Sequence, residues 1–183
     1  ELDDAILHLR TNENEIGTWI FQTSGDCDLM AAHDAALAAH RDHWLVREVT
    51  LYLKRTLKRI DVTSRSIYAL IEPASCFTGT LLELALAADR SYMLDGQFEG
   101  DNRPPALASL TAMNFGPYEM VNGLTRLQSR FLDEEETIAA LEQRQGEAMD
   151  ALTAEAAGLV TFAPDDIDWE DEVRIAIEEG AVF

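Results

Sequence analysis

The stretch CFTGTLLELALAAD, residues 76–89, decides how the fold is interpreted. Small turn residues precede an apolar run, residues 81–88, in which Glu83 is the single charged residue. A turn followed by good helix formers predicts a helix that begins near Thr80. A carboxylate inside so apolar a helix is unfavourable unless it is paired or used, because burial disfavours its charged form. Glu83 therefore needs a structural or a chemical explanation.

The structural explanation is a capping box. In the sequence Thr80-Leu-Leu-Glu83, the threonine would cap the helix and the glutamate three residues later would reach back to it. This interpretation requires no catalysis.

The chemical explanation uses the same turn. Backbone N–H groups in the first turn of a helix have no intrahelical partner, so the Thr80 amide could stabilise a carbonyl oxygen that gains charge. Gly79 would let a ligand approach the backbone closely. Glu83, flanked by leucines, would have its pKa raised by desolvation and could move protons near neutral pH. The two explanations compete for the same carboxylate oxygens.

Strands and helices alternate on both sides of this stretch, which favours one α/β layered domain over residues 1–183. We predict strands at residues 5–12, 18–23, 66–73, 90–94 and 160–164, and a strand leading to a turn at 106–116. We predict helices at residues 31–60, where the alanine-rich part 31–40 can be separate, and at 81–88, 120–131, 133–159 and 167–180. Residues 95–105 have the composition of an exposed loop.

Charge is the extreme feature of the composition. The chain has 34 acidic and 14 basic residues, a formal net charge of −20. Such a surface repels nucleic acid and anionic membranes, and no apolar run approaches the ~20 residues of a membrane span. We expect neither a nucleic-acid partner nor a membrane partner. Since the chain begins at Glu1 without a methionine, we also expect it to be a piece of a longer protein.

The cysteines and histidines predict no metal site. Cys27 and Cys76 make neither a disulfide framework nor a metal-ligand spacing, and a reducing cytoplasm is the simplest interpretation. The four histidines lack a zinc constellation, and the acidic runs at residues 133–136 and 165–172 are typical of helix N-terminal turns.

The run GTLLELALAADRSYML, residues 79–94, resembles the signature of the crotonase (enoyl-CoA hydratase) superfamily, in which a glycine-rich turn leads into a helix that bears a glutamate. Longer segments resemble one family within it, the 2,3-epoxybenzoyl-CoA dihydrolases, whose proteins are considerably longer than this chain. These segments are HLRTNENEIGTWIFQT, HRDHWLVREVTLYLKRTLKRIDVTSRS, EPASCFTGTLLELALAADRSYML, MNFGPYEMVNGLTRL and GLVTFAPDDIDWEDEVRIAIEE.

The resemblance implies a crotonase-like spiral of ββα turns with C-terminal helices. It implies a CoA thioester substrate, no metal or redox cofactor, and a homo-oligomer. The implied reaction is the addition of water to 2,3-epoxybenzoyl-CoA, with ring opening and release of formate, to give 3,4-dehydroadipyl-CoA semialdehyde. Two alternatives stay open: a catalytically impaired scaffold with the same fold, and a general enoyl-CoA hydratase or isomerase.

The resemblance also implies roles for individual residues. Thr80, after Gly79, matches the oxyanion-hole position, and Glu83 matches the first acid/base glutamate. The second oxyanion donor is expected around residues 23–25. A set of further residues is expected to shape the acyl site: Cys76, Asn114, Phe115 and Gly116.

One departure concerns the second glutamate of the superfamily, whose position here is Ala112. Alanine cannot move a proton, so three explanations stay open. The chain is an inactivated variant; or Glu119 substitutes; or the alignment is shifted and an acid such as Glu99 or Asp101 serves.

The main cationic cluster comprises Lys54, Arg55, Lys58 and Arg59. It could meet the phosphates of CoA, but a solvated helix face is the favoured interpretation.

Overall fold

The computed structural model describes residues 1–180 of the 183 residues. Its helices are α1 (Leu2–Asn12), α2 (Cys27–Ala39), α3 (Trp44–Asp61), α4 (Leu82–Ala87), α5 (Arg126–Arg130), α6 (Glu135–Glu142), α7 (Ala151–Ala156) and α8 (Trp169–Gly180). Its strands are β1 (Thr18–Phe21), β2 (Ser66–Ile71), β3 (Phe77–Thr78), β4 (Arg90–Met93) and β5 (Ala108–Ser109). There are also two 3₁₀ turns among the described residues. The first, η1 (Gly79–Leu81), directly precedes the helix that carries Glu83, and the second, η2 (Ala112–Asn114), follows β5.

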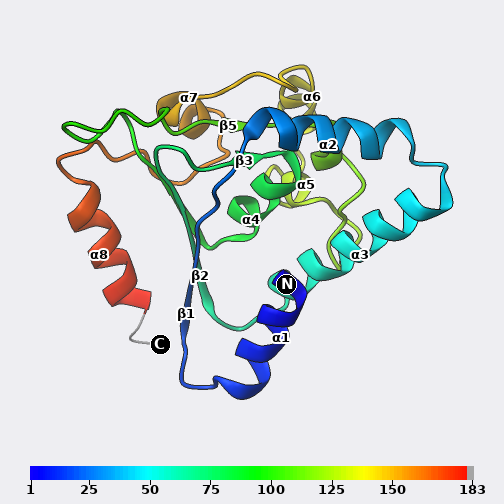
Figure 1. Ribbon diagram of the computed structural model, residues 1–183, viewed down its shortest axis with the longest axis horizontal. Coiled ribbons are helices and arrows are strands. Elements are labelled where there is room, and N and C mark those ends of the chain that lie inside the picture. The colour runs from blue at the N-terminus through cyan, green and yellow to red at the C-terminus, as the bar shows by residue number, and fades with distance from the viewer. Residues whose placement is uncertain (181–183) are drawn as a thin grey trace.

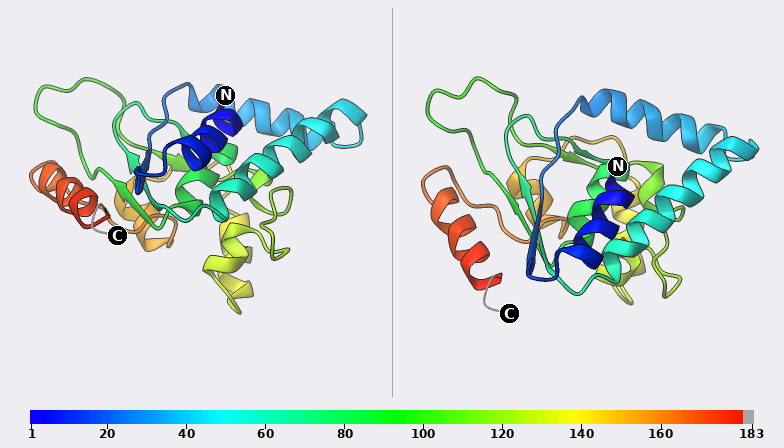
Figure 2. Two further views of the ribbon diagram at one scale, coloured as in Figure 1. Left: turned by 90° about the horizontal axis from the view of Figure 1, so that it is seen from below. Right: turned by 60° about the horizontal axis from the view of Figure 1, so that its bottom comes forward.

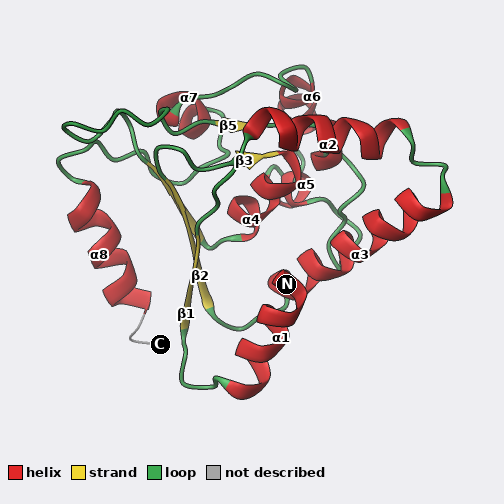
Figure 3. Ribbon diagram, in the orientation of Figure 1, coloured by secondary structure: helices red, strands yellow, loops and turns green. Residues whose placement is uncertain are grey.

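Two small parallel sheets organise the chain, as Figure 3 shows by colour. The first has the order β1–β2–β4, and the second joins β3 to β5. Parallel strands need crossover connections, which α2 and α3 supply between β1 and β2, and the segment that contains α4 supplies between β2 and β4. The result is the α/β layered domain that the alternation of the sequence predicts.

The three-stranded sheet separates two apolar layers. Along β2, Ile67, Ala69 and Ile71 join the main core, while Leu70 joins a smaller cluster that includes Trp169 of α8. This alternation is the period of two that a strand requires when both of its faces are covered. Figures 1 and 2 show α8 alone on one side of the sheet, with α1, α3 and α4 on the other side.

Helix α4 lies inside the main core. Its leucines and alanines are buried almost all around, a pattern typical of a helix covered on every side. It contacts β2, β3, β4, α3 and α5, so its position is fixed by several elements at once. The turn before α4 therefore has little freedom to move, and neither has Glu83 in its first turn.

Most of the predicted elements are confirmed. Strands occur within residues 18–23, 66–73, 90–94 and 106–116, and helices within 81–88 and 167–180. Residues 95–105 contain no helix or extended strand. The helical region 31–60 is divided into α2 and α3, and α2 begins four residues earlier than the predicted region. Along α3, Leu57 and Ile60 are buried, whereas Leu45 and Val49 near its N-terminal end are exposed.

The strand predicted at residues 5–12 is wrong, because this segment is the helix α1. Ile6 is buried and Leu9 packs on the core, which is the spacing of one helix face. Asp3 accepts a hydrogen bond from Thr56 and pairs with Arg59, both on α3, and so holds α1 beside it. Figures 1 and 2 show the two helices side by side.

The long helices predicted after residue 120 are also wrong in extent. Gly123 and Asp133 adopt positive φ angles, and α5 begins only at the capping box formed by Thr125 and Gln128. The next helix, α6, ends at Glu142, and Gly146, with φ +80°, lies in the turn region between α6 and α7. In place of the strand predicted at residues 160–164, Phe162 forms an isolated bridge with Tyr92.

No helix within residues 1–180 is both long and apolar enough to cross a membrane.

Candidate active site

Glu83 is a fully buried carboxylate with a partner for each oxygen. Its exposed fraction is 1%, although Glu83 is the second residue of α4 and so lies at the end of a helix. Oε2 accepts a hydrogen bond from Arg126 Nη1 at 2.7 Å, and Oε1 accepts one from Asn114 Nδ2 at 2.7 Å. The apolar run thus carries a charge because a guanidinium and an amide are buried with it.

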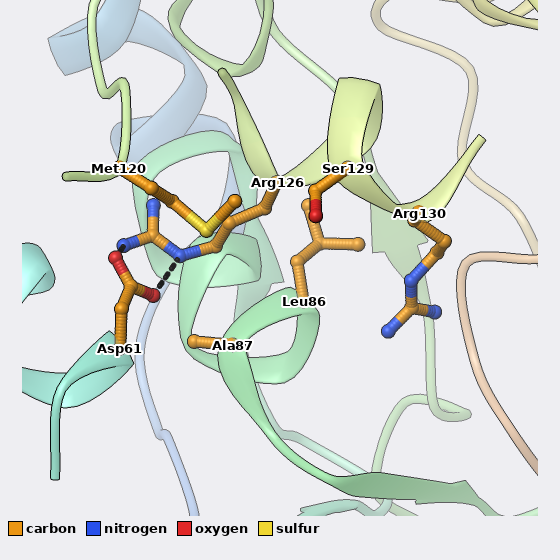
Figure 4. Close-up of a pocket in the computed structure, with 7 residues that line it drawn as sticks. All are labelled: Asp61, Leu86, Ala87, Met120, Arg126, Ser129 and Arg130. Atoms are coloured by element: carbon orange, nitrogen blue, oxygen red, sulfur yellow. Dashed lines mark hydrogen bonds and ion pairs between the residues drawn. The ribbon is translucent and has the colours of Figure 1, made fainter. Parts of the chain in front are cut away.

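Arg126 connects Glu83 to a second carboxylate. Its Nε and Nη2 donate to the two oxygens of Asp61 at 3.0 and 2.7 Å, which is a bidentate pair. Figure 4 shows Asp61, at the end of α3, facing Arg126 from α5. One guanidinium therefore serves two carboxylates from α3 and α4.

The shared cation leaves one negative charge in excess if both acids are ionised. Burial raises the pKa of Glu83 above its ordinary value, and this outweighs the opposing effects of Arg126 and Asn114. Burial likewise raises the pKa of Asp61 more than Arg126 lowers it. The two acids and the arginine form a site that can hold a proton.

The capping box predicted for residues 80–83 is wrong. Helix α4 has Leu81 at its N-cap and no side-chain cap bond, and both oxygens of Glu83 bind residues outside the helix. Glu83 is therefore buried with a raised pKa, as the chemical explanation requires. Each of its carboxylate oxygens, however, already accepts a hydrogen bond from another side chain.

The Thr80 amide, the expected oxyanion donor, is occupied by the protein itself. It donates to Asp34 Oδ2 at 2.8 Å, and the Thr80 hydroxyl donates to Asp34 Oδ1 at 2.6 Å. The hydroxyl of Thr111 donates to the same carboxylate at 2.8 Å. Asp34 is itself 1% exposed. An internal carboxylate from α2 thus lies where the resemblance would place an acyl oxygen.

Gly79 is required at this turn. Its φ of +51° is in the left-handed region, and a side-chain carbon there would overlap with Asp34 Oδ2 and with the side chain of Thr111. The close approach that the sequence predicts for a ligand is made here by the Asp34 carboxylate.

The remaining predicted site residues divide into two groups. Asn114 lies at the centre, because its amide donates both to Glu83 and to the carbonyl oxygen of Gly79 at 2.9 Å. Phe115 and Gly116 follow it at partly buried positions. Cys76 is buried on the other side of the turn, where Thr23 accepts from its amide and donates to its carbonyl.

The carboxylates proposed to replace a second glutamate lie elsewhere. Glu119 forms an ion pair with Lys54 at 2.8 Å, and this pair lowers the pKa of Glu119. Asp101 pairs with Arg103 in the 95–105 loop, and Glu99 is exposed in that loop. Ala112 opens η2, two residues before Asn114. The acid that shares a partner with Glu83 is instead Asp61.

The cationic cluster of α3 is largely paired. Arg59 binds Asp3 at 2.6 Å, Arg55 lies 3.9 Å from the same acid, and Lys54 binds Glu119. These contacts agree with a solvated helix face. No group of three or more histidine, cysteine or acidic residues within residues 1–180 is placed to hold a metal ion.

A cavity of about 300 Å³ lies beside the ion network, as Figure 4 shows. Its lining comprises Asp61, Leu86, Ala87, Met120, Arg126, Ser129 and Arg130. Arg130 donates to the carbonyl oxygens of Gly158 and Leu159, and burial lowers its pKa. Asp61 and Arg126 reach this cavity, whereas Glu83 is not part of its lining.

Sequence reasoning missed three of the central residues. Asp34 is the only acidic residue in the alanine-rich run of residues 31–40, and Arg126 lies between Leu124 and Leu127 in the sequence. The signal that singled out Glu83, a charged residue among apolar ones, also marks Asp34, whereas Arg126 lies in a largely polar segment, residues 125–130. Asp61 gave no such signal, because it ends a helix rich in charges.

A pH experiment follows from the raised pKa of Glu83. The folded state binds this proton more tightly than the unfolded state, so the stabilising effect is complete below the ordinary value of 4.5 and is lost as pH rises through the raised pKa. We expect the wild type to lose stability relative to Glu83→Gln as pH increases from 4.5 to 8, measured by urea unfolding.

Glu119→Gln is the matched control. Lys54 lowers the pKa of Glu119, so its contribution is present above 4.5 and is lost as pH falls. Between pH 4.5 and 8 the difference in stability between the wild type and Glu119→Gln should therefore stay nearly constant, whereas the difference for Glu83→Gln should change. A difference between the wild type and Glu83→Gln that does not change with pH would contradict the raised pKa.

No family model matches the chain. Over all 183 residues the chain is 56% identical to benzoyl-CoA-dihydrodiol lyase from Aromatoleum evansii, and the match covers 32% of that protein. The chain thus spans about a third of the length of this curated relative.

Solved structures share the fold at low identity. Enoyl-CoA hydratase from Bacillus halodurans has a TM-score of 0.67 and 18% identity, covering 100% of this chain and 68% of that one. AtuE from Pseudomonas aeruginosa has a TM-score of 0.65 and 17% identity, covering 97% of this chain and 64% of that one. The crotonase fold expected from the sequence is confirmed.

Proposed function

Because the chain has the crotonase fold and is related over its whole length to benzoyl-CoA-dihydrodiol lyase, we propose that it works in a lyase or hydratase that acts on a CoA thioester. The finer proposal is hydrolytic ring opening of 2,3-epoxybenzoyl-CoA, with release of formate and formation of 3,4-dehydroadipyl-CoA semialdehyde. The identity along the entire chain carries this proposal. Water and the thioester suffice for the reaction, so we propose neither a metal nor a redox cofactor.

A thioester suits this chemistry because its carbonyl can accept electrons from the ring. Hydrogen-bond donors aimed at the carbonyl oxygen stabilise the charge that develops there, and a carboxyl of raised pKa can protonate the ring or direct water. For Thr80 and Glu83 to act in this way, Asp34 and Arg126 would have to release them.

A second candidate role is favoured by a specific observation. Both oxygens of Glu83 are bound by buried partners, and the Thr80 amide donates to Asp34. With alanine at position 112, this part of the chain would then serve as a structural crotonase unit, and the protein would hold its thioester at another site. These contacts favour the scaffold alternative raised by the sequence for this part of the chain.

Glu83→Gln separates the two roles of this residue. If Glu83 is catalytic, formate release from 2,3-epoxybenzoyl-CoA falls by about 10²–10⁴-fold while the fold is retained. If Glu83 is structural, stability changes while turnover per folded molecule stays close to that of the wild type. We expect the second result, because glutamine keeps the bond to Arg126 and because Glu83 does not line the cavity beside the network.

Ala112→Glu is the companion variant. Restoring an acid at this position should raise formate release only if Glu83 has a catalytic role. Absence of formate release from the wild-type protein and from both variants would reject the proposed reaction, and a general enoyl-CoA hydratase assay would then test the remaining alternative.

A further inference from the structure

The two cysteines of the chain, positions 27 and 76, lie at one junction of the fold. Thr23 donates to the Cys76 carbonyl at 2.6 Å and accepts from the Cys76 amide at 3.0 Å. The Cys27 thiol donates to the Ser75 carbonyl at 3.8 Å, which places its sulfur beside the Ser75–Cys76 peptide. The start of α2 and the turn before β3 thus meet where the Cys27 sulfur lies against the Ser75–Cys76 peptide.

The two thiols differ in their access to solvent. Cys27, the first residue of α2, is partly exposed, whereas Cys76 is 1% exposed. Burial, with a further contribution from the Cys27 side chain, raises the pKa of Cys76 to about 11. Cys76 is therefore a protonated thiol at neutral pH, and Cys27 is the sulfur that an oxidant meets first.

A cavity leads to this junction. Its volume is about 370 Å³, and its lining includes Cys27, Ser75, Gly25, Ala74, Pro104 and Pro105. The hydroxyl oxygen of Ser75 is buried there with no hydrogen-bond partner among the described residues. A small oxidant such as hydrogen peroxide fits this volume, and Cys27 is one of the residues that line it.

We infer that Cys27 and Cys76 form an intramolecular disulfide under peroxide. The Cys27 sulfur attacks one peroxide oxygen, the O–O bond breaks, and a sulfenic acid and one water result. The Cys76 sulfur then displaces the hydroxyl from the sulfenic sulfur, forming the S–S bond and a second water. Two thiols are oxidised to one disulfide, and one hydrogen peroxide is reduced to two waters.

The bond would link α2 to the turn that leads to Gly79. Because α2 also carries Asp34, oxidation would fasten the helix that occupies the Thr80 amide. This inference rests on the two cysteines and is independent of the proposed function.

The test is peroxide treatment of the purified protein, followed by blocking of free thiols and mapping of tryptic peptides. We expect both free thiols to disappear and a cross-link to join the peptides of residues 11–41 and 66–90, which contain the two cysteines. Closing so long a loop should raise the melting temperature by roughly 5–10 °C, reversibly with dithiothreitol.

Cys27→Ser is the control, since its side chain is partly exposed and the substitution leaves the core intact. It should retain a free Cys76 after treatment and show no change in melting temperature. Cys76→Ala removes the second sulfur, so Cys27 in this variant should be oxidised to a sulfenic acid or a higher acid and should form no intramolecular disulfide. Over-oxidised Cys27 beside a free Cys76 in the wild type, or a disulfide between two molecules, would overturn the inference.

Discussion

Replacing Arg126 with methionine is expected to lower the free energy of unfolding by about 3–5 kcal/mol at neutral pH. Arg126 is 3% exposed and holds Glu83 and Asp61 through contacts of 2.7–3.0 Å. Methionine is similar in length but uncharged, so two buried carboxylates would lose their shared cation. Urea unfolding followed by circular dichroism gives the measurement.

The loss should depend on pH. Glu83 and Asp61 can take up protons when the cation is removed, since burial already raises the pKa of each. The defect of Arg126→Met should therefore be smaller at pH 5 than at pH 8. Adding Glu83→Gln and Asp61→Asn to the variant should recover much of the stability, because the uncompensated charges are then gone.

Lys54→Met is the matched control for this substitution. It breaks the ion pair with Glu119 at 2.8 Å on the surface, where solvent already screens the charges. Its effect should be a small fraction of that of Arg126→Met. Equal effects of the two variants would show that the buried network contributes no more than a surface ion pair.

The environment of Glu83 could be predicted from the sequence, but its partner could not. A charged residue between leucines indicates that another group compensates its charge, and the local sequence pattern predicted that a capping box does so. The actual donor, Arg126, is 43 residues further along the chain, and Asn114 is 31 residues away. Such contacts depend on how α4 and α5 pack, which no local spacing records.

The same limit explains the unforeseen role of Asp34. The first turn of α4 was expected to offer a free amide because intrahelical partners are absent there. A carboxylate from α2, 46 residues earlier, supplies the acceptor instead. Local physics predicted the unsatisfied donor correctly, and tertiary packing decided which oxygen satisfies it.

Fold class was more predictable than the ends of the elements. Turn residues bound the apolar runs of β2 and α4, and the alternation of such bounded runs indicates an α/β domain. Segment 5–12 was ambiguous, because four apolar residues in five positions fit both periods. Packing on α3 through Asp3 decided in favour of the helix.

Gly79→Ala is expected to have an effect at least as large as Arg126→Met. A methyl group at position 79 would overlap with Asp34 Oδ2 and with Thr111, and the backbone is in the left-handed region at φ +51°. Asp34 would have to leave three donors while remaining buried, for a loss of roughly 4 kcal/mol or more. Urea unfolding measures it, and a decrease in soluble protein would accompany it.

Gly100→Ala isolates the steric part of this loss. Gly100 also has a left-handed backbone, with φ +78°, but a side-chain carbon there would meet nothing within 4 Å. Its replacement should cost only the backbone strain of about 1–2 kcal/mol. If the two variants were equally stable, the Asp34 carboxylate would not lie against residue 79. The Thr80 amide would then be free to bind an external acyl oxygen, and the structural role argued for this turn would give way to the catalytic one.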